Sequence, residues 1–194
     1  MPLQFAPESK SSTAVVRAGM ERVLQRKNAL GLASDALGTL EVATPHSVYD
    51  LRADEIANGG GLETAHAAGT RYLVTANGGP LAAAEVQTDA SGQPLLANLN
   101  YGPYVAATAN AFASLNASAS VGEGSYEARL LRFSAIYLVA IWLKAQGKGN
   151  DLIYAVAPVP SGLQAEKPYS VEDFLAAIRP LAEKRASNKQ SSIP

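Results

Sequence analysis

The two histidines are the first residues to weigh for chemistry, because imidazole acts near neutral pH both as a general base and as a metal ligand. They are His46 and His66, and they lie far apart in the sequence. Neither has a second histidine at the close spacing that helical zinc sites use. We therefore interpret both as structural or surface residues. The alternative is a hydrolase or transferase whose dispersed site uses His46 or His66.

Glycine-rich and acidic segments do not match phosphate or metal motifs. Gly59-Gly60-Gly61 lacks the lysine and hydroxyl residue of a P-loop, and Gly122-Glu123-Gly124 lacks the later glycine of a dinucleotide-binding loop. No carboxylates alternate around a glycine as in a calcium loop. The chain has no cysteine, which excludes disulfides, thiolate metal sites and cysteine nucleophiles. The sequence thus predicts no catalytic residue, no metal and no cofactor.

Three aromatic residues are the remaining candidates for a binding surface. Tyr101 and Tyr104 flank Gly102-Pro103, where a predicted strand meets a predicted helix, and such junctions are commonly exposed. Trp142 lies in the apolar stretch 133–143, where burial in the core is the usual outcome. Aromatic side chains can floor a ligand pocket or anchor a partner. We predict Tyr101, Tyr104 and Trp142 as ligand- or partner-binding residues.

Composition narrows the class of protein and of partner. The chain has 194 residues, of which 47% are hydrophobic, enough for one sizeable core. Its 16 basic and 17 acidic residues give no basic excess, so nucleic acid is not a predicted partner. The longest apolar stretch, 133–143, is too short to span a bilayer. Without a leader-like N-terminus, the compartment stays open between the cytoplasm and export with a removed signal peptide.

Apolar spacing and turn residues predict most of the secondary structure. Helices are expected from a cap at Thr13 to about Asn28 and from Pro103 to residue 115, with a helical turn at 52–57. Gly19 costs the first helix about 1 kcal/mol relative to alanine, so that helix needs tertiary packing. Strands are expected over 70–76, 81–88, 93–99, 126–133 and 151–156. Ser170 caps a last helix, which Pro180 should kink or divide.

Three segments are less regular. Pro45 makes 40–51 a predicted edge strand or connector, with Thr44 extended. Residues 134–144 fit either a strand or a helix capped by Ser134, and we favour the helix. The small, polar residues 116–125 are the best candidate for a mobile loop.

Taken together, the elements predict a soluble α+β protein in which an antiparallel β-meander sheet has helices packed mainly on one face. We expect a single domain over 13–186, a flexible lead over 1–12 and a flexible tail over 187–194. With no readable catalytic set, our first hypothesis is a non-enzymatic module that binds a protein or a small molecule. A subunit of a homo-oligomer, packed through 103–115 and 81–88, is a further alternative beside the histidine-dependent enzyme.

Overall fold

The computed structural model describes residues 3–26, 38–118, 121 and 124–190. The predicted helix end at Asn28 lies outside these residues, and the predicted mobile loop 116–125 lies partly outside them. Within the described residues, no helix is long and apolar enough to cross a membrane.

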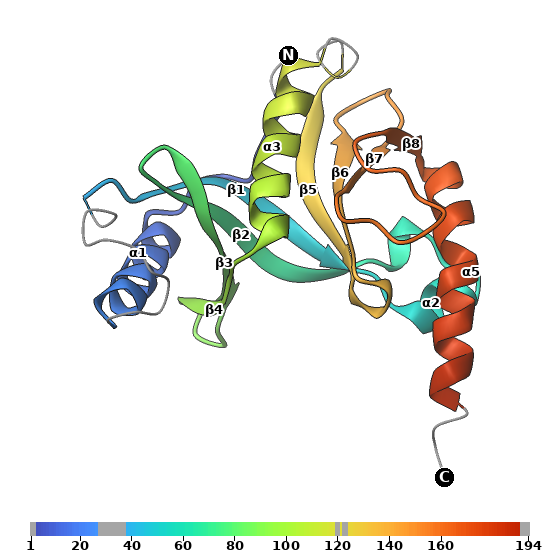
Figure 1. Cartoon of the computed structure of the whole chain (residues 1–194), viewed down its shortest axis with the longest axis horizontal. Helices are drawn as coiled ribbons and strands as arrows, with labels where there is room; N and C mark the ends of the chain where they lie inside the picture. The colour runs from blue at the N-terminus through green and yellow to red at the C-terminus, as the bar shows by residue number, and fades with distance from the viewer. Residues whose placement is uncertain (1–2, 27–37, 119–120, 122–123, 191–194) are drawn as a thin grey trace.

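One eight-stranded sheet runs through the molecule, in the spatial order β4-β3-β2-β1-β5-β6-β7-β8 (Figure 1). Its strands are β1 (Glu41–Asp50), β2 (His66–Ala76), β3 (Gly79–Thr88), β4 (Pro94–Asn100), β5 (Tyr126–Phe133), β6 (Leu138–Ala145), β7 (Leu152–Val156) and β8 (Pro168–Ser170). All neighbours pair antiparallel except β1 and β5, which are parallel. The α+β class is therefore confirmed, but the sheet is mixed and not the antiparallel meander that the sequence predicted.

The parallel contact between β1 and β5 divides the sheet into two halves of four strands. We call β1–β4 the first half and β5–β8 the second half. In each half the first strand leads through a helical turn into a second strand, and the third and fourth strands follow outward in order. A long helix comes after each fourth strand. The halves thus repeat one order of elements, although the sequence shows no convincing repeat.

Helices cover both faces of the sheet, so the prediction that they pack mainly on one face is not confirmed. The helices are α1 (Lys10–Gln25), α2 (Ala53–Ala57), α3 (Pro103–Ala117) and α5 (Val171–Gln190). Alternate residues of β6 show the arrangement, because successive side chains of a strand point to opposite faces. Ile141 shares a core cluster with α3, whereas Ala140 and Trp142 share one with α5. In β2, Leu73 packs with α3, and Tyr72 packs with α1 on the face that α5 also covers.

The first helix starts earlier than the sequence predicts. The hydroxyl of Ser9 accepts a hydrogen bond from the Ser12 N–H, so α1 begins at Lys10 and not after Thr13. Gly19 faces the sheet, and a Cβ there would meet the Leu96 side chain of β4. The glycine therefore permits a close approach between α1 and β4, which is the tertiary packing that this helix needs. The last helix continues through Pro180 undivided.

The prediction that 40–51 is an edge strand or connector is wrong, because β1 is central and pairs with both β2 and β5. Pro45 is tolerated there since the β1–β2 register is interrupted between Ala43 and His46, where no ladder N–H is required. Thr44 takes up this irregularity with a φ of 54° and is not extended as expected.

The preference for a helix over 134–144 is also wrong. Only Ser134–Ile136 form a helical turn, and Leu138–Ala145 is strand β6. This strand pairs with β5 on one side and β7 on the other, and its residues are buried on both faces. A doubly buried strand has an apolar run without alternation, which the sequence alone does not separate from a buried helix.

Candidate functional site

The two predicted tyrosines lie apart and have different roles. The Tyr104 hydroxyl is 2.7 Å from the Tyr137 carbonyl oxygen and 3.0 Å from that of Pro158, so it fixes the start of α3 against β6 and β7. The nearest polar contact of the Tyr101 hydroxyl is the Met20 Sδ at 3.9 Å. Partial burial raises the pKa of both phenols. Tyr104 therefore acts as a structural link, and Tyr101 remains a partly exposed surface residue.

Trp142 lies on the face of the sheet that α5 covers. Its Nε1–H donates to Asp151 Oδ2 at 2.8 Å, and the Arg129 guanidinium lies 5.0 Å from the ring centre. Burial by itself would raise the pKa of Asp151, but hydrogen bonds from the Ala145 N–H, Trp142 and Lys144 outweigh it and lower that pKa. The indole is thus buried and its polar group is satisfied. The structure does not bring Trp142 together with Tyr101 or Tyr104.

His46 is fully buried on the face that α3 covers. Its Nδ1 is 2.7 Å from the Thr44 carbonyl oxygen, so Nδ1 carries the proton and donates it, and the ring packs edge-on against Phe112. Burial lowers the pKa of His46 to about 4. Its Nε2 and the Nε of Arg71, its partner across β1–β2, are the two buried side-chain nitrogens without a partner among the described residues.

His66 lies at the surface and forms a pair with a carboxylate. Its Nε2 is 2.8 Å from Glu55 Oε1, and the two side chains are 44% and 27% exposed. Glu55 comes from α2 and His66 from the start of β2, so the short helix after β1 positions the carboxylate. This is the one histidine–carboxylate pair among the residues that the structure describes.

Charged residues also gather at the contact between the two halves. Arg132 of β5 donates to Asp50 of β1 at 2.8 Å and to Glu85 of β3 at 2.7 Å. Glu85 also accepts from Asn100 and lies 3.9 Å from Arg71. Burial would lower the pKa of Arg132, but the two carboxylates outweigh it and raise that pKa. The two positive charges and the two negative charges of this cluster compensate each other, so we interpret it as a structural contact that joins the two halves.

A pocket of about 440 Å³ lies between the end of α3 and strands β7 and β8. Its apolar side is formed by Leu115, Val121, Leu152 and the ring of Tyr154, and its polar rim by Ser114, Ser118, Glu166 and Ser170. Ligand pockets commonly combine an apolar lining with a few polar groups. We take this α3–β7–β8 pocket as the candidate functional site.

Two polar groups define one end of this pocket. The Tyr154 hydroxyl has no hydrogen-bond partner among the described residues, and burial together with the charge of Glu166 raises its pKa. The Glu166 carboxylate forms no ion pair with any described residue. Glu166 also has a φ of 59°, and its N–H donates to the Ala155 carbonyl oxygen at 3.0 Å. Non-glycine residues in this conformation are uncommon and concentrate at functional sites.

The β8 wall of the pocket is held by its own contacts. Tyr169 pairs with Ile153 in the sheet, and its hydroxyl accepts a hydrogen bond from the Gln164 N–H at 2.7 Å. The Ser170 hydroxyl accepts from the Asp173 N–H at 3.0 Å, which confirms Ser170 as the cap of α5. These contacts position Glu166 and Ser170 before any ligand binds.

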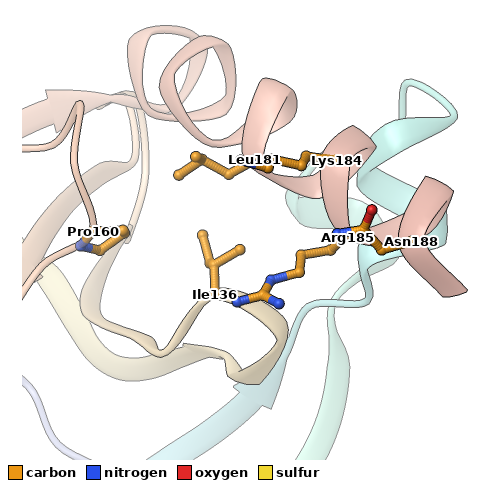
Figure 2. A pocket seen from close by; sticks show the side chains of 6 residues that line it. All are labelled: Ile136, Pro160, Leu181, Lys184, Arg185 and Asn188. Atoms are coloured by element: carbon orange, nitrogen blue, oxygen red, sulfur yellow. The ribbon is translucent and has the colours of Figure 1, made fainter.

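A second pocket, of about 320 Å³, lies beside the C-terminal part of α5. Ile136 and Leu181 point into it, and Lys184 and Arg185 form its basic rim (Figure 2). Both rim residues are long, exposed side chains on a helix surface, so their rotamers determine the shape of this pocket. It is less preformed than the α3–β7–β8 pocket.

Sequence reasoning missed the pocket residues because they come from three distant segments and none belongs to a motif. The one local signal was the long, proline-containing connection between β7 and β8, since connections longer than usual often carry function. Among the described residues, no three histidine or carboxylate side chains lie close enough to hold a metal ion. Comparison with protein-family models, curated proteins and solved structures finds no significant match to this chain.

Proposed function

We propose that the protein is a binding module whose α3–β7–β8 pocket holds a small, largely apolar molecule with a protonated amine. The observation that supports this most directly is the pairing of an apolar lining with an unpaired carboxylate at one end. A volume of about 440 Å³ lies within the range of roughly 300–1,000 Å³ typical of small-molecule sites.

The charge of the polar end favours a cation over a neutral or anionic group. Glu166 is exposed at the rim, so its carboxylate is available to an incoming ligand and would repel an anion. The phenol of Tyr154 keeps its proton, because burial and Glu166 raise its pKa, and it offers a second polar contact. An ammonium group with an aromatic or aliphatic body satisfies both ends of the pocket.

Three probes of matched shape test the proposal: phenethylamine, 2-phenylethanol and phenylacetate. Chemical-shift perturbation of the full chain should map all binding to Leu115, Leu152, Tyr154 and Ser170. We expect the affinities to fall in the order amine, alcohol, carboxylate. If none of the three probes shifts these residues at millimolar concentration, the proposal is wrong.

Glu166→Gln isolates the electrostatic part. Removing one partially exposed charge pair should weaken phenethylamine binding by roughly threefold to tenfold, which corresponds to about 1 kcal/mol, and should leave 2-phenylethanol unchanged. Glu183→Gln is the matched control, because Glu183 is exposed on α5 and does not line the pocket. If the two variants change the affinity for phenethylamine equally, Glu166 does not contact the ligand.

A second candidate function is a hydrolase or transferase that uses the Glu55–His66 pair. The specific observation is the 2.8 Å contact between His66 Nε2 and Glu55 Oε1, the geometry with which a carboxylate orients a general base. No described hydroxyl is hydrogen-bonded to this imidazole, so the first proposal is favoured. Screening ester and phosphoester substrates with the wild type and His66→Ala decides the matter, since activity equal in both excludes His66.

A further inference from the structure

The two edges of the sheet differ in their protection against pairing with another chain. β4 and β8 are the outermost strands, so each has an outer side that pairs with no other strand of the described chain (Figure 1). β8 has only three residues, begins with Pro168, and follows the charged residues Glu166 and Lys167. Short length, proline and charge are the features that natural proteins use to block an edge.

β4 lacks most of these features. It has seven residues, Pro94–Asn100, and none of them is charged. Its proline stands at the first position, where it blocks only the start of the edge. A shift in the β3–β4 register at Glu85/Val86 leaves pairing stretches on either side of Ala97. The remaining backbone groups form an open template for another strand.

An exposed apolar side chain lies near each end of β4. Three large hydrophobic residues are exposed among those described, and two of them are Leu95, 57% exposed, and Tyr101, 38% exposed. Leu95 is the second residue of β4, and Tyr101 follows its last residue. A strand that paired with β4 would come close to both side chains and reduce their contact with water.

We propose that β4 is the interface of a homodimer, in which it pairs antiparallel with β4 of a second copy of this chain. An antiparallel pair of identical strands has two-fold symmetry, so one contact satisfies both copies and closes the assembly. The strand is uncharged, so no like charges within the two β4 strands oppose this pairing. Continuation into a head-to-tail fibre is disfavoured, because the other edge, β8, is short and blocked.

This interface leaves the proposed ligand pocket open. The pocket lies beside β8, at the opposite end of the sheet from β4. The dimer is therefore independent of the ligand proposal, and failure of one leaves the other standing. The sequence suggested helix 103–115 and strand 81–88 as surfaces that pack against a copy; the strand is β3, which pairs with β2 and β4, so the interface proposed here is a different one.

Sedimentation equilibrium of the full chain between 1 and 200 μM tests the proposal. We expect a monomer–dimer equilibrium without larger species. Leu95→Lys/Asn98→Lys places one exposed lysine on each side of Ala97 and should raise the dimer Kd at least tenfold, because like charges then meet across the two-fold axis. Tyr137→Lys is the matched control, since it also replaces an exposed aromatic or aliphatic residue by lysine, away from β4, and it should leave the Kd unchanged.

Hydrogen exchange of the wild type keeps the test independent of how the variants fold. Amides of residues 95–100 should become more protected as the protein concentration rises, while those of 168–170 should not change. A wild-type monomer at 200 μM overturns the proposal. A dimer whose β4 amides show no such change also overturns it. So does a dimer that persists in the double lysine variant while that variant keeps a native circular dichroism spectrum. The proposal is equally wrong if β4 pairs with a strand of a different protein and not with a second copy.

Discussion

The two halves of the sheet share one order of elements, and a helix precedes each half. The two halves differ in where this preceding helix packs on the sheet. In the first half, α1 packs directly on the outer strand β4, where Gly19 allows contact with Leu96. In the second half, α3 is the preceding helix, and it packs toward the middle of the sheet on Leu73, Ala83 and Ile141. The outer strand β8 therefore has no helix directly against it on that face.

This difference makes one end of the sheet suitable for pairing with another strand and the other end suitable for binding a ligand. α1 covers one face of β4 and leaves the edge of the strand open, which suits pairing with another strand. Displacing α3 from β8 leaves the 440 Å³ pocket, and the blocked edge beside it discourages strand addition. We infer that the first half serves assembly and the second half serves ligand binding, with the charged contact at β1 and β5 holding them in one sheet.

Breaking that contact should have the largest effect. Arg132→Leu removes the side chain of β5 that bonds both Asp50 and Glu85 of the first half. Two carboxylates then remain beside one buried cation. Arg132, Glu85 and Asp50 are 23%, 12% and 39% exposed, so we expect a loss of about 3 kcal/mol, at the lower end of the cost of breaking a buried pair. The free energy of unfolding from urea titration measures the effect.

Arg129→Leu is the control for this variant. Arg129 lies on the same strand, but its ion pair is with Glu127, two residues away on β5. The ion pair joins no other strand, although the guanidinium also lies 5.1 Å from the ring centre of Tyr49 on β1 and 5.0 Å from that of Trp142 on β6. We expect a loss of about 1 kcal/mol, because these contacts are weaker than the two ion pairs of Arg132. If both substitutions cost the same, the halves are not held by Arg132.

Between pH 6.5 and 4, acid should reduce stability mainly through His46 of the first half. Burial, with a smaller contribution from the cationic Arg71, lowers the pKa of His46 to about 4, against 6.5 in the unfolded chain. Between pH 6.5 and 4, the His46 imidazole is protonated in the unfolded state but stays neutral in the folded state. The stability present above pH 6.5 is therefore lost as the pH falls toward 4, by about 3 kcal/mol in total.

His46→Gln should remove this loss between pH 6.5 and 4, as followed by urea titrations at several pH values. His66→Gln is the control, since His66 is partly exposed, and it should retain the loss. The second half has no buried histidine at the corresponding position. Ser47 of β1 pairs with Arg129 of β5, and the residue before Arg129 is Ala128, whereas the residue before Ser47 is His46. A His46→Gln profile equal to that of the wild type would contradict the buried, neutral imidazole.

Elements with a local signal could be predicted from the sequence. Pro103 at the first helical position and Ser170 at a cap mark α3 and α5 correctly, and alternation marks β5. Prediction failed where the deciding contacts are distant in sequence. β1 is central only because β5 pairs with it, and β6 is a strand because β5 and β7 bury both of its faces. The pocket likewise depends on where α3 lies, which no local pattern encodes.

The contact between α1 and β4 can be sharpened by a double-mutant cycle. Gly19→Ala improves helix propensity by about 1 kcal/mol, but its Cβ would meet the Leu96 side chain, and overpacking costs about 1–3 kcal/mol. We expect a net destabilisation of about 1 kcal/mol in the wild-type background. In the Leu96→Ala background the same change should stabilise the fold by up to about 1 kcal/mol. Gly19→Ala that stabilises both backgrounds equally would show that α1 does not approach β4 closely.

The smallest expected effect concerns the hydrogen bonds that fix the start of α3. The Tyr104 hydroxyl bonds the carbonyl oxygens of Tyr137 and Pro158, and Tyr104→Phe removes that link at a cost of about 1 kcal/mol. Tyr101→Phe is the matched control, because the Tyr101 hydroxyl has only a 3.9 Å contact with Met20 Sδ, and it should change the free energy of unfolding very little. If the link also keeps the pocket open, Tyr104→Phe should weaken phenethylamine binding while Tyr101→Phe does not. Unchanged binding with reduced stability would mean that the packing of α3 on β3, and not this hydrogen bond, sets the shape of the second half.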